Sequence, residues 1–301
     1  MTVTATAPGK IVLAGEYAVL WDAPAICMAV NRRAKATVAD SSDGECHVRT
    51  PGFESDERFA VVDAVGGGER PACEIELDTT AFSERGRKTG IGSSAAVTVA
   101  LTAAVGNSTD VYKDALEAHA RLQGGKGSGV DVAAAVHGGL LEYTRVGHKA
   151  YSLAWPEGLA FRVIWTGVPA STAARIEQLA SQAKKASRSA LLLAASRIAA
   201  AWRAGDADTI LSEYVDYIGV LRQFGVDHDL GIFDAGHDEL TDAAMVAGLV
   251  YKPAGAGGGD IGIVFGRDEA ELDAFIANRA GLIYGVLSCE LDPDGILLES
   301  R

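Results

Sequence analysis

The 301-residue sequence lacks the patterns that mark several large classes of protein. Its four cysteines are scattered without a C-x-x-C pair, which argues against structural zinc and a disulfide framework and favours a reducing compartment. Its six histidines show no metal-binding spacing. No apolar run approaches about 18 residues, so no transmembrane helix is expected. No signal peptide precedes residues 7–10, and we expect a cytoplasmic protein.

Basic residues are also scarce. The sequence has 27 Lys and Arg against 40 Asp and Glu, a formal net charge of −13. This balance argues against non-specific binding to nucleic acid or to anionic membranes, both of which need basic patches. An acidic protein that handles phosphates must concentrate its few cations locally, so single lysines and arginines become informative. The sequence gives no indication of the oligomeric state.

The order of the predicted elements indicates an α+β protein with two domains, residues 1–150 and residues 151–301. The first half alternates short β-like runs with glycine turns, and the second half is mostly helical. The expected strands are residues 10–14, 34–39, 46–49, 73–77, 140–144, 161–165, 250–252, 261–265 and 286–291. The expected helices are residues 94–105, 111–123 (capped by Asp110), 131–137, 173–186, 187–203, 207–224, 237–247 and 269–279.

The most informative segment is residues 88–98, a glycine turn that leads into a helix. Gly90 and Gly92 free the backbone to curl, and Ser93 and Ser94 supply hydroxyls where the helix begins. A helix N-terminus with unpaired N–H groups binds anions readily, and a nucleotide phosphate is the ligand suggested. The alternative is a plain helix cap, because serine is a favoured cap residue.

Two further glycine-rich segments strengthen the functional interpretation. Residues 124–131 run into an alanine-rich helix whose first turn contains Asp131. Residues 255–260 contain four glycines, and so many glycines carry an entropic cost that a simple hairpin does not require. Close approach of the backbone to a ligand is therefore our interpretation of the third segment.

Charged side chains near these segments could carry chemistry. Lys10 follows a Pro-Gly turn, and its ammonium could neutralise charge on a phosphoryl group, although a surface lysine is the alternative. Asp131 could orient or deprotonate an acceptor or restrain Lys10, or simply favour the helix start through the dipole. Glu16 and Tyr17 could be structural or could line an acceptor pocket.

These segments, in this order, resemble the GHMP small-molecule kinases, and the resemblance extends from Ala7 to about Phe265. Within that superfamily the sequence is most similar to the phosphomevalonate kinase family, with Tyr17 where mevalonate kinases usually carry histidine. The segments that carry the resemblance are residues 7–19, 88–96, 118–138, 165–172 and 252–260.

The resemblance implies the two-domain GHMP kinase fold with a ribosomal-protein-S5-like N-terminal domain. It also implies ATP, Mg²⁺ and transfer of a phosphoryl group to the phosphate of 5-phosphomevalonate, a step of isoprenoid biosynthesis. By motif, the catalytic pair would be Lys10 and Asp131, and the magnesium contact would be Ser94. The implied ATP-binding residues are Lys88, Gly90, Gly92, Ser93 and Ser94. The implied substrate-binding residues are Glu16, Tyr17, Ser128, Gly129, Gly255, Ala256, Gly257, Gly258 and Gly259.

The sequence departs from the family pattern at some positions. Ala254 replaces the usual serine, and the glutamate that helps to hold magnesium in mevalonate kinases is missing near Ala120. Another GHMP kinase, such as a mevalonate kinase, and a non-catalytic metabolite sensor of the same fold remain alternatives. The candidate cations for an acceptor phosphate are Arg145, Lys184, Lys185 and Arg188.

Overall fold

A computed structural model describes residues 2–52, 58–68, 70, 72–106, 108–125, 127–181, 186–279 and 284–300. The chain divides into two compact units. Unit 1 comprises Met1–Ile11, Met28–Leu141 and Glu290–Arg301, and unit 2 comprises Val12–Cys27 and Glu142–Cys289. The chain thus passes from one unit to the other four times. The two domains expected from the sequence, residues 1–150 and 151–301, have a single boundary between them, and this division stays a prediction.

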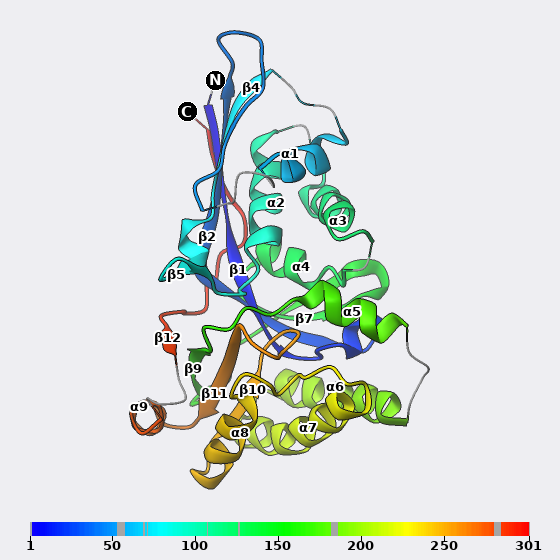
Figure 1. The fold of residues 1–301 in the computed structure, drawn as a ribbon, viewed down its shortest axis with the longest axis vertical. Coiled ribbons are helices and arrows are strands. Elements are labelled where there is room, and N and C mark those ends of the chain that lie inside the picture. Colours follow the sequence, from blue (N-terminus) through cyan, green and yellow to red (C-terminus); the bar gives the residue numbers. More distant parts are fainter. Residues whose placement is uncertain are drawn as a thin grey trace. The chain divides into compact units, whose positions relative to one another are not determined.

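Unit 1 contains a twisted sheet in the order β13-β1-β2-β4-β3 (Figure 1). Its strands are β1 (Thr2–Ala14), β2 (Ala25–Asp40), β3 (His47–Arg49), β4 (Cys73–Asp78) and β13 (Leu297–Ser300). In β4 the side chains alternate between buried and more accessible, as expected for a strand with one covered face. That face is covered by α1 (Arg58–Gly66), α2 (Ser93–Ala104), α3 (Val111–Leu122) and α4 (Val130–His137).

The sequence explains why α2 lies at the centre of unit 1. All of its residues from Ala95 to Ala104 are buried, and most of them are small or β-branched. Small side chains let a helix approach its neighbours closely on every side. The next helix, α3, is amphipathic and begins where the sequence predicted, with the side chain of Asp110 accepting a hydrogen bond from the N–H of Lys113.

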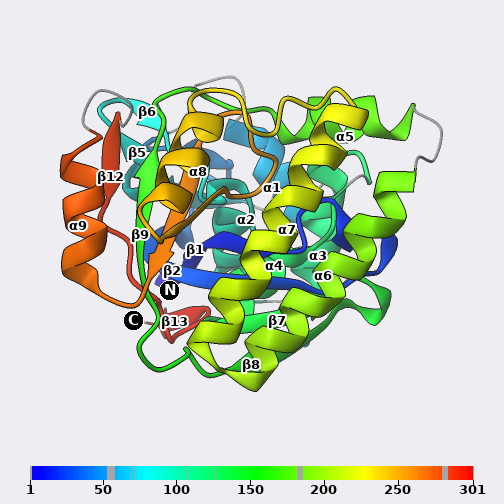
Figure 2. The same cartoon turned by 90° about the horizontal axis from the view of Figure 1, so that it is seen from below.

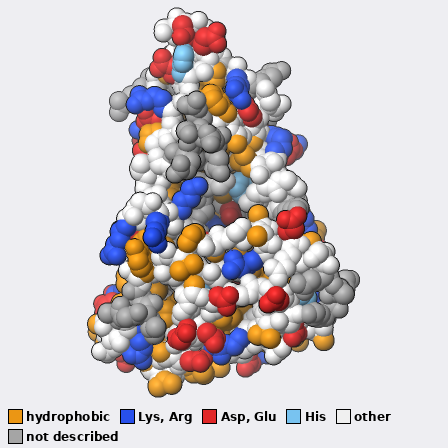
Figure 3. Space-filling view, viewed as in Figure 1, with side chains coloured by type: hydrophobic (Ala, Val, Ile, Leu, Met, Phe, Trp, Pro, Cys, Tyr) orange, Lys and Arg blue, Asp and Glu red, His pale blue; other side chains and the backbone are white. Residues whose placement is uncertain are grey.

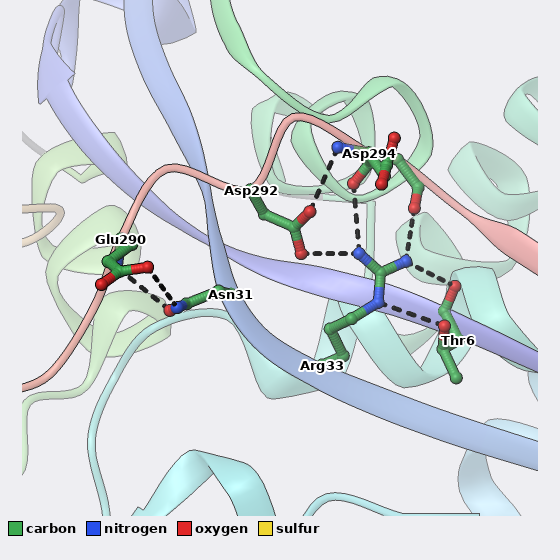
Figure 4. A network of polar contacts seen from close by, with 7 residues as sticks. Thr6, Asn31, Arg33, Glu290, Asp292 and Asp294 are labelled. Atoms are coloured by element: carbon green, nitrogen blue, oxygen red, sulfur yellow. Dashed lines mark hydrogen bonds and ion pairs between the residues drawn. The ribbon is translucent and has the colours of Figure 1, made fainter.

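The last part of the chain is fixed to the sheet of unit 1 by a polar network around Arg33 (Figure 4). The guanidinium of Arg33 donates to Asp292 Oδ2 at 2.6 Å, to the carbonyl of Gly295 at 2.5 Å and to Thr6 Oγ1 at 3.1 Å. The sequence analysis predicted a final strand at residues 286–291. This prediction was wrong in extent, because β12 covers only Gly285–Leu287 and β13 follows it.

Unit 2 combines a four-stranded antiparallel sheet with helices (Figure 2). The sheet order is β10-β11-β9-β12, and its strands are β9 (Ala160–Trp165), β10 (Val250–Pro253), β11 (Ile261–Gly266) and β12. The helices are α5 (Thr172–Ala180), α6 (Ala186–Ala204), α7 (Ala207–Asp227), α8 (His237–Val246) and α9 (Glu269–Ala277). Aromatic packing fills the core, where Tyr214 stacks on Phe265 with ring centroids 5.0 Å apart.

Several short elements complete the fold. They are β5 (Ser83–Glu84), β6 (Arg87–Lys88), β7 (Leu140–Thr144), β8 (Lys149–Leu153) and the 3-10 turns η1 (Ala18–Trp21), η3 (Thr80–Phe82) and η4 (Val146–His148). Strand β7 pairs with β2, and β8 pairs with β7. The predicted α+β class is confirmed.

Within the described ranges, no helix is both long and apolar enough to cross a membrane. On the face shown in Figure 3, basic side chains are scattered among acidic ones.

Candidate active site

The start of α2 in unit 1 has the features of an anion site. Gly92 caps the helix with a φ of 88° and provides no side-chain hydrogen bond. The backbone N–H of Ala96 donates to the carbonyl of Gly92, and it is the first N–H after the turn that has a main-chain acceptor. The N–H groups of Ser93, Ser94 and Ala95 donate to no acceptor in the described part of the chain. Three unpaired donors at the positive end of a helix favour a bound anion.

Lys10 packs directly against this turn. Its own N–H donates to the carbonyl of Ile91 at 2.8 Å, which joins β1 to the glycine turn. A Cβ atom on Gly92 would lie 3.2 Å from Cγ and 3.3 Å from Cε of Lys10. The glycine at position 92 therefore serves two needs, its positive φ and the close contact with the lysine stem.

The predicted proximity of Lys10 and Asp131 is confirmed. Nζ of Lys10 lies 3.6 Å from Oδ1 of Asp131, and the two side chains are 12% and 28% exposed. Asp131 stands in the first turn of α4, after Gly129, which has a φ of 85°. Two helices that both begin at a positive-φ glycine thus contribute to one cluster of an ammonium, a carboxylate and free N–H groups.

The other predicted residues of unit 1 lie at the ends of the same elements. Lys88 is exposed at the end of β6, and Gly90 lies in the turn between β6 and α2. Ser128 precedes α4, where its Oγ accepts a weak hydrogen bond from the N–H of Val130 at 3.4 Å. Their roles stay predictions.

The sequence analysis did not single out His119 as a residue of the candidate site. This residue of α3 is 4% exposed, and its Nε2 atom has no hydrogen-bond partner within the described chain. Burial lowers the pKa of His119, the charge of Asp131 opposes that shift, and the charge of Lys10 adds to it. His119 therefore lies within the field of the Lys10–Asp131 pair as a buried neutral ring. Only its place inside the resembling segment 118–138 pointed to it.

In unit 2, Glu16 belongs to a buried polar network. Its Oε1 is paired with the ammonium of Lys252, and its Oε2 accepts a 2.7 Å hydrogen bond from the hydroxyl of Tyr217. Glu16 is 4% exposed and Lys252 is fully buried. Burial lowers the pKa of Lys252, and the charge of Glu16 opposes that shift. Both oxygens of Glu16 are thus engaged within unit 2, and its place among the substrate-binding residues stays a prediction.

Tyr17 connects this network to the third glycine segment. Its backbone has a φ of 59°, and its hydroxyl donates to the carbonyl of Ala256 at 2.6 Å. Burial raises the pKa of Tyr17, so the phenol stays protonated and able to donate. Two residues that the resemblance assigned to the substrate, Tyr17 and Ala256, thus contact each other within unit 2.

The glycines of the third segment have a reason that sequence reasoning did not foresee. A Cβ on Gly257 would lie 2.4 Å from the carbonyl oxygen of Ile232, and one on Gly259 would lie 2.5 Å from that of Val168. At Gly258 it would meet the guanidinium of Arg175 at 1.8 Å. Contact with the protein itself therefore explains these three glycines, whereas Gly255 faces open space.

The buried ring of His237 fixes the far end of this segment. Its Nε2 lies 3.0 Å from the carbonyl oxygen of Gly259, and its Nδ1 lies 2.8 Å from the hydroxyl of Tyr251. A carbonyl only accepts, so Nε2 carries the proton and Nδ1 accepts from the tyrosine. The neutral ring is fully satisfied, and burial lowers its pKa from 6.5 to about 4.

This pKa shift predicts a loss of stability in mild acid. In the unfolded chain His237 takes up a proton as the pH falls below about 6.5, whereas in the folded chain it does so only near pH 4. Acid therefore favours unfolding across this window, by on the order of 3 kcal/mol in total. Urea unfolding from pH 7 to pH 4 should show a steeper loss in the wild type than in His237→Gln, which keeps an N–H donor but does not titrate. Equal slopes in the two proteins would contradict the assignment.

Comparisons with known proteins identify the family of the chain. A family model described as the GHMP kinases N terminal domain matches residues 60–139. A phosphomevalonate kinase of Streptomyces sp. (strain CL190) is 33% identical, with 97% of each chain covered. The chain therefore belongs to the GHMP kinases, a family of small-molecule phosphotransferases.

Two further relatives represent the two acceptor types. Mevalonate kinase of Bos taurus is 26% identical, with 92% of this chain and 89% of the relative covered. The solved structure of Streptococcus pneumoniae phosphomevalonate kinase in complex with phosphomevalonate and AMPPNP has a TM-score of 0.79 and 21% identity. It covers 97% of this chain and 99% of its own. The predicted GHMP kinase fold is confirmed.

Proposed function

We propose that the protein transfers the γ-phosphoryl group of ATP to the phosphate of 5-phosphomevalonate, which yields ADP and 5-diphosphomevalonate in the mevalonate pathway. The observation that supports this function most is the Lys10–Asp131 pair beside the open N-terminus of α2. The end-to-end similarity to a phosphomevalonate kinase supports the choice of acceptor.

The residues at the start of α2 fit the phosphates of ATP. The free N–H groups of Ser93, Ser94 and Ala95 can donate to phosphate oxygens, and the helix dipole favours their negative charge. The ammonium of Lys10 adds a positive charge next to Gly92. Lys88 and Gly90, in the preceding turn, complete the proposed ATP-binding set.

The residues present also fit a magnesium ion carried in with ATP. No cluster of three or more His, Cys, Asp or Glu that could hold a metal occurs in the described ranges. Magnesium bound with a nucleotide needs only one or two protein oxygens, because phosphates and water supply the others. The hydroxyl of Ser94, which is exposed and makes no hydrogen bond with described residues, would hold the ion. The bound ion would neutralise phosphate charge during transfer.

The chemistry of a phosphate acceptor assigns different tasks to the two charged residues. The second pKa of a phosphate monoester is about 6, so its oxygen is already ionised at neutral pH and needs no base. The main barrier is then the charge of two approaching phosphate groups, which Lys10 would neutralise. Asp131, at 3.6 Å, would hold the ammonium of Lys10 in place rather than remove a proton.

The residues proposed to contact the acceptor are described within each unit separately. In unit 1 they are Ser128 and Gly129, which precede α4 and Asp131. In unit 2 they are Tyr17 and the segment from Gly255 to Gly259, which Tyr17 contacts through the carbonyl of Ala256.

The proposal predicts one acceptor from a panel of four. ADP release in a coupled assay should depend on 5-phosphomevalonate and should be absent with mevalonate, homoserine and galactose. Turnover with mevalonate alone would instead make the protein a mevalonate kinase, the function of the Bos taurus relative. Tight binding of one acceptor without any turnover would favour a metabolite sensor.

A further inference from the structure

We infer that Arg175 binds the phosphate group of the acceptor, together with the main-chain N–H groups of Gly255 and Ala256. This inference rests on the proposed function, because it names the residue that would distinguish a phosphorylated acceptor from an unphosphorylated one. None of the cations that the sequence suggested for this task is Arg175.

Two contacts within unit 2 fix the position of Arg175. Helix α5 is capped by Ser171, whose side chain accepts a hydrogen bond from the N–H of Ala174. One turn into the helix, Nε of Arg175 donates to the carbonyl of Leu230 at 2.9 Å. A Cβ atom built on Gly258 would lie only 1.8 Å from Nη2 of Arg175, so the guanidinium occupies the space beside this glycine. The guanidinium therefore lies against the backbone of the glycine segment.

The charge of Arg175 is not balanced by a carboxylate. In the described ranges no Asp or Glu forms an ion pair with it. Other arginines of unit 2 differ, since Arg162, Arg197 and Arg222 each pair with two acidic side chains. In a protein of net charge −13, a positioned guanidinium without an acidic partner has its charge and remaining donors available for an anion.

The adjacent backbone offers further donors. The N–H groups of Gly255 and Ala256 donate no hydrogen bond within the described chain. The segment is held by other groups, because the N–H of Gly258 donates to the carbonyl of Ile232 and the carbonyl of Ala256 accepts from Tyr17. Successive free N–H groups beside a guanidinium suit a phosphate.

The other candidate cations lack this setting. The guanidinium of Arg188 lies over the ring of Trp21, 3.8 Å from its centroid. Arg145 is exposed, and its guanidinium lies a long 3.5 Å from the carbonyl oxygen of Leu20. Lys184 and Lys185 lie outside the described residues.

The test compares the binding of two ligands that differ by one phosphate group. Calorimetry with 5-phosphomevalonate and with mevalonate, both without ATP, should be performed on the wild type, Arg175→Met and Arg175→Lys. Arg175→Met should weaken the binding of 5-phosphomevalonate about 10- to 100-fold, because hydrogen bonds to a charged group are lost. The binding of mevalonate should not change. Arg175→Lys should fall between, because an ammonium keeps the charge but not the planar fork of donors.

Arg197→Met serves as the control, because it removes a surface arginine of the same unit that is already paired with Glu213 and Asp216. Equal weakening of both ligands in Arg175→Met would indicate a structural role and would overturn the inference. So would unchanged binding of 5-phosphomevalonate. If Arg175→Met does not fold, Arg175→Lys provides the test. A weaker affinity for 5-phosphomevalonate with an unchanged affinity for mevalonate supports the inference, and an equal change in both affinities overturns it.

Kinetics separate the failure of this inference from failure of the proposed function. If the wild type turns over 5-phosphomevalonate and Arg175→Met keeps the same KM for it, only the role of Arg175 is wrong. If the wild type does not turn over 5-phosphomevalonate at all, the proposed function is wrong and the inference falls with it. The KM for ATP should be the same in the wild type and in Arg175→Met.

Discussion

Replacing Lys10 with methionine should lower kcat about 10²- to 10³-fold, the loss expected when one group that stabilises transition-state charge is removed. Methionine keeps the length of the stem that packs on Gly92, so the turn before α2 should stay in place. The ammonium that lies 3.6 Å from Asp131 would be lost. A steady-state assay with saturating ATP and acceptor measures the effect directly.

Lys35→Met is a matched control, because Lys35 is an exposed lysine of β2 that takes no part in the candidate site. It should leave kcat unchanged. Asp131→Asn should have a smaller effect than Lys10→Met, since Asp131 is assigned to position the ammonium. A Lys10→Met variant with a kcat close to that of the wild type would remove Lys10 from the mechanism. A larger loss in Asp131→Asn than in Lys10→Met would instead favour a catalytic base.

Replacing Lys252 with methionine should lower the free energy of unfolding by about 3–5 kcal/mol, the cost of removing one partner of a buried ion pair. Glu16, which is only 4% exposed, would keep its hydrogen bond from the hydroxyl of Tyr217. It would lose the ammonium of Lys252, which balances its negative charge. Urea unfolding followed by tryptophan fluorescence measures the change.

The double variant Glu16→Leu, Lys252→Met provides the control for this second prediction. It removes both charges and should recover much of the stability lost in Lys252→Met, because no unpaired charge stays buried. A Lys252→Met protein as stable as the wild type would show that the pair contributes nothing. A double variant less stable than Lys252→Met would show that Glu16 matters for other reasons, such as its bond with Tyr217.

Sequence reasoning was accurate where structure is determined locally. Helix α3 was expected from Val111 with Asp110 as its cap, and the structure has both. Helix α2 was expected from Ser94 and begins at Ser93, because the glycines before it favour a turn and an apolar run follows them. Helix α1 (Arg58–Gly66) was missed, because nine residues that end in glycine give too short a pattern to identify.

The candidate site was predictable only in part, because its contacts join residues that are distant in the sequence. The proximity of Lys10 and Asp131 was first suggested by their charges and flanking glycine segments, and the family resemblance then made them a catalytic pair. The ion pair of Glu16 could not be predicted, because nothing near Glu16 in the sequence reveals Lys252 as its partner. Arg175 was predicted only as part of a helix, because its significance depends on Gly258 and Leu230, both more than fifty residues away.

The pairing of β13 with β1 has a consequence for how the chain can be made. Thr6 pairs with Leu297, and Arg33 is anchored to Asp292, so the sheet of unit 1 includes a strand from the far end of the sequence. During synthesis this edge of β1 stays unpaired until residues 297–300 have been made and can reach it. An open edge strand can recruit other chains. A fragment that stops at residue 150 would keep that edge permanently, and we would expect such a fragment to aggregate.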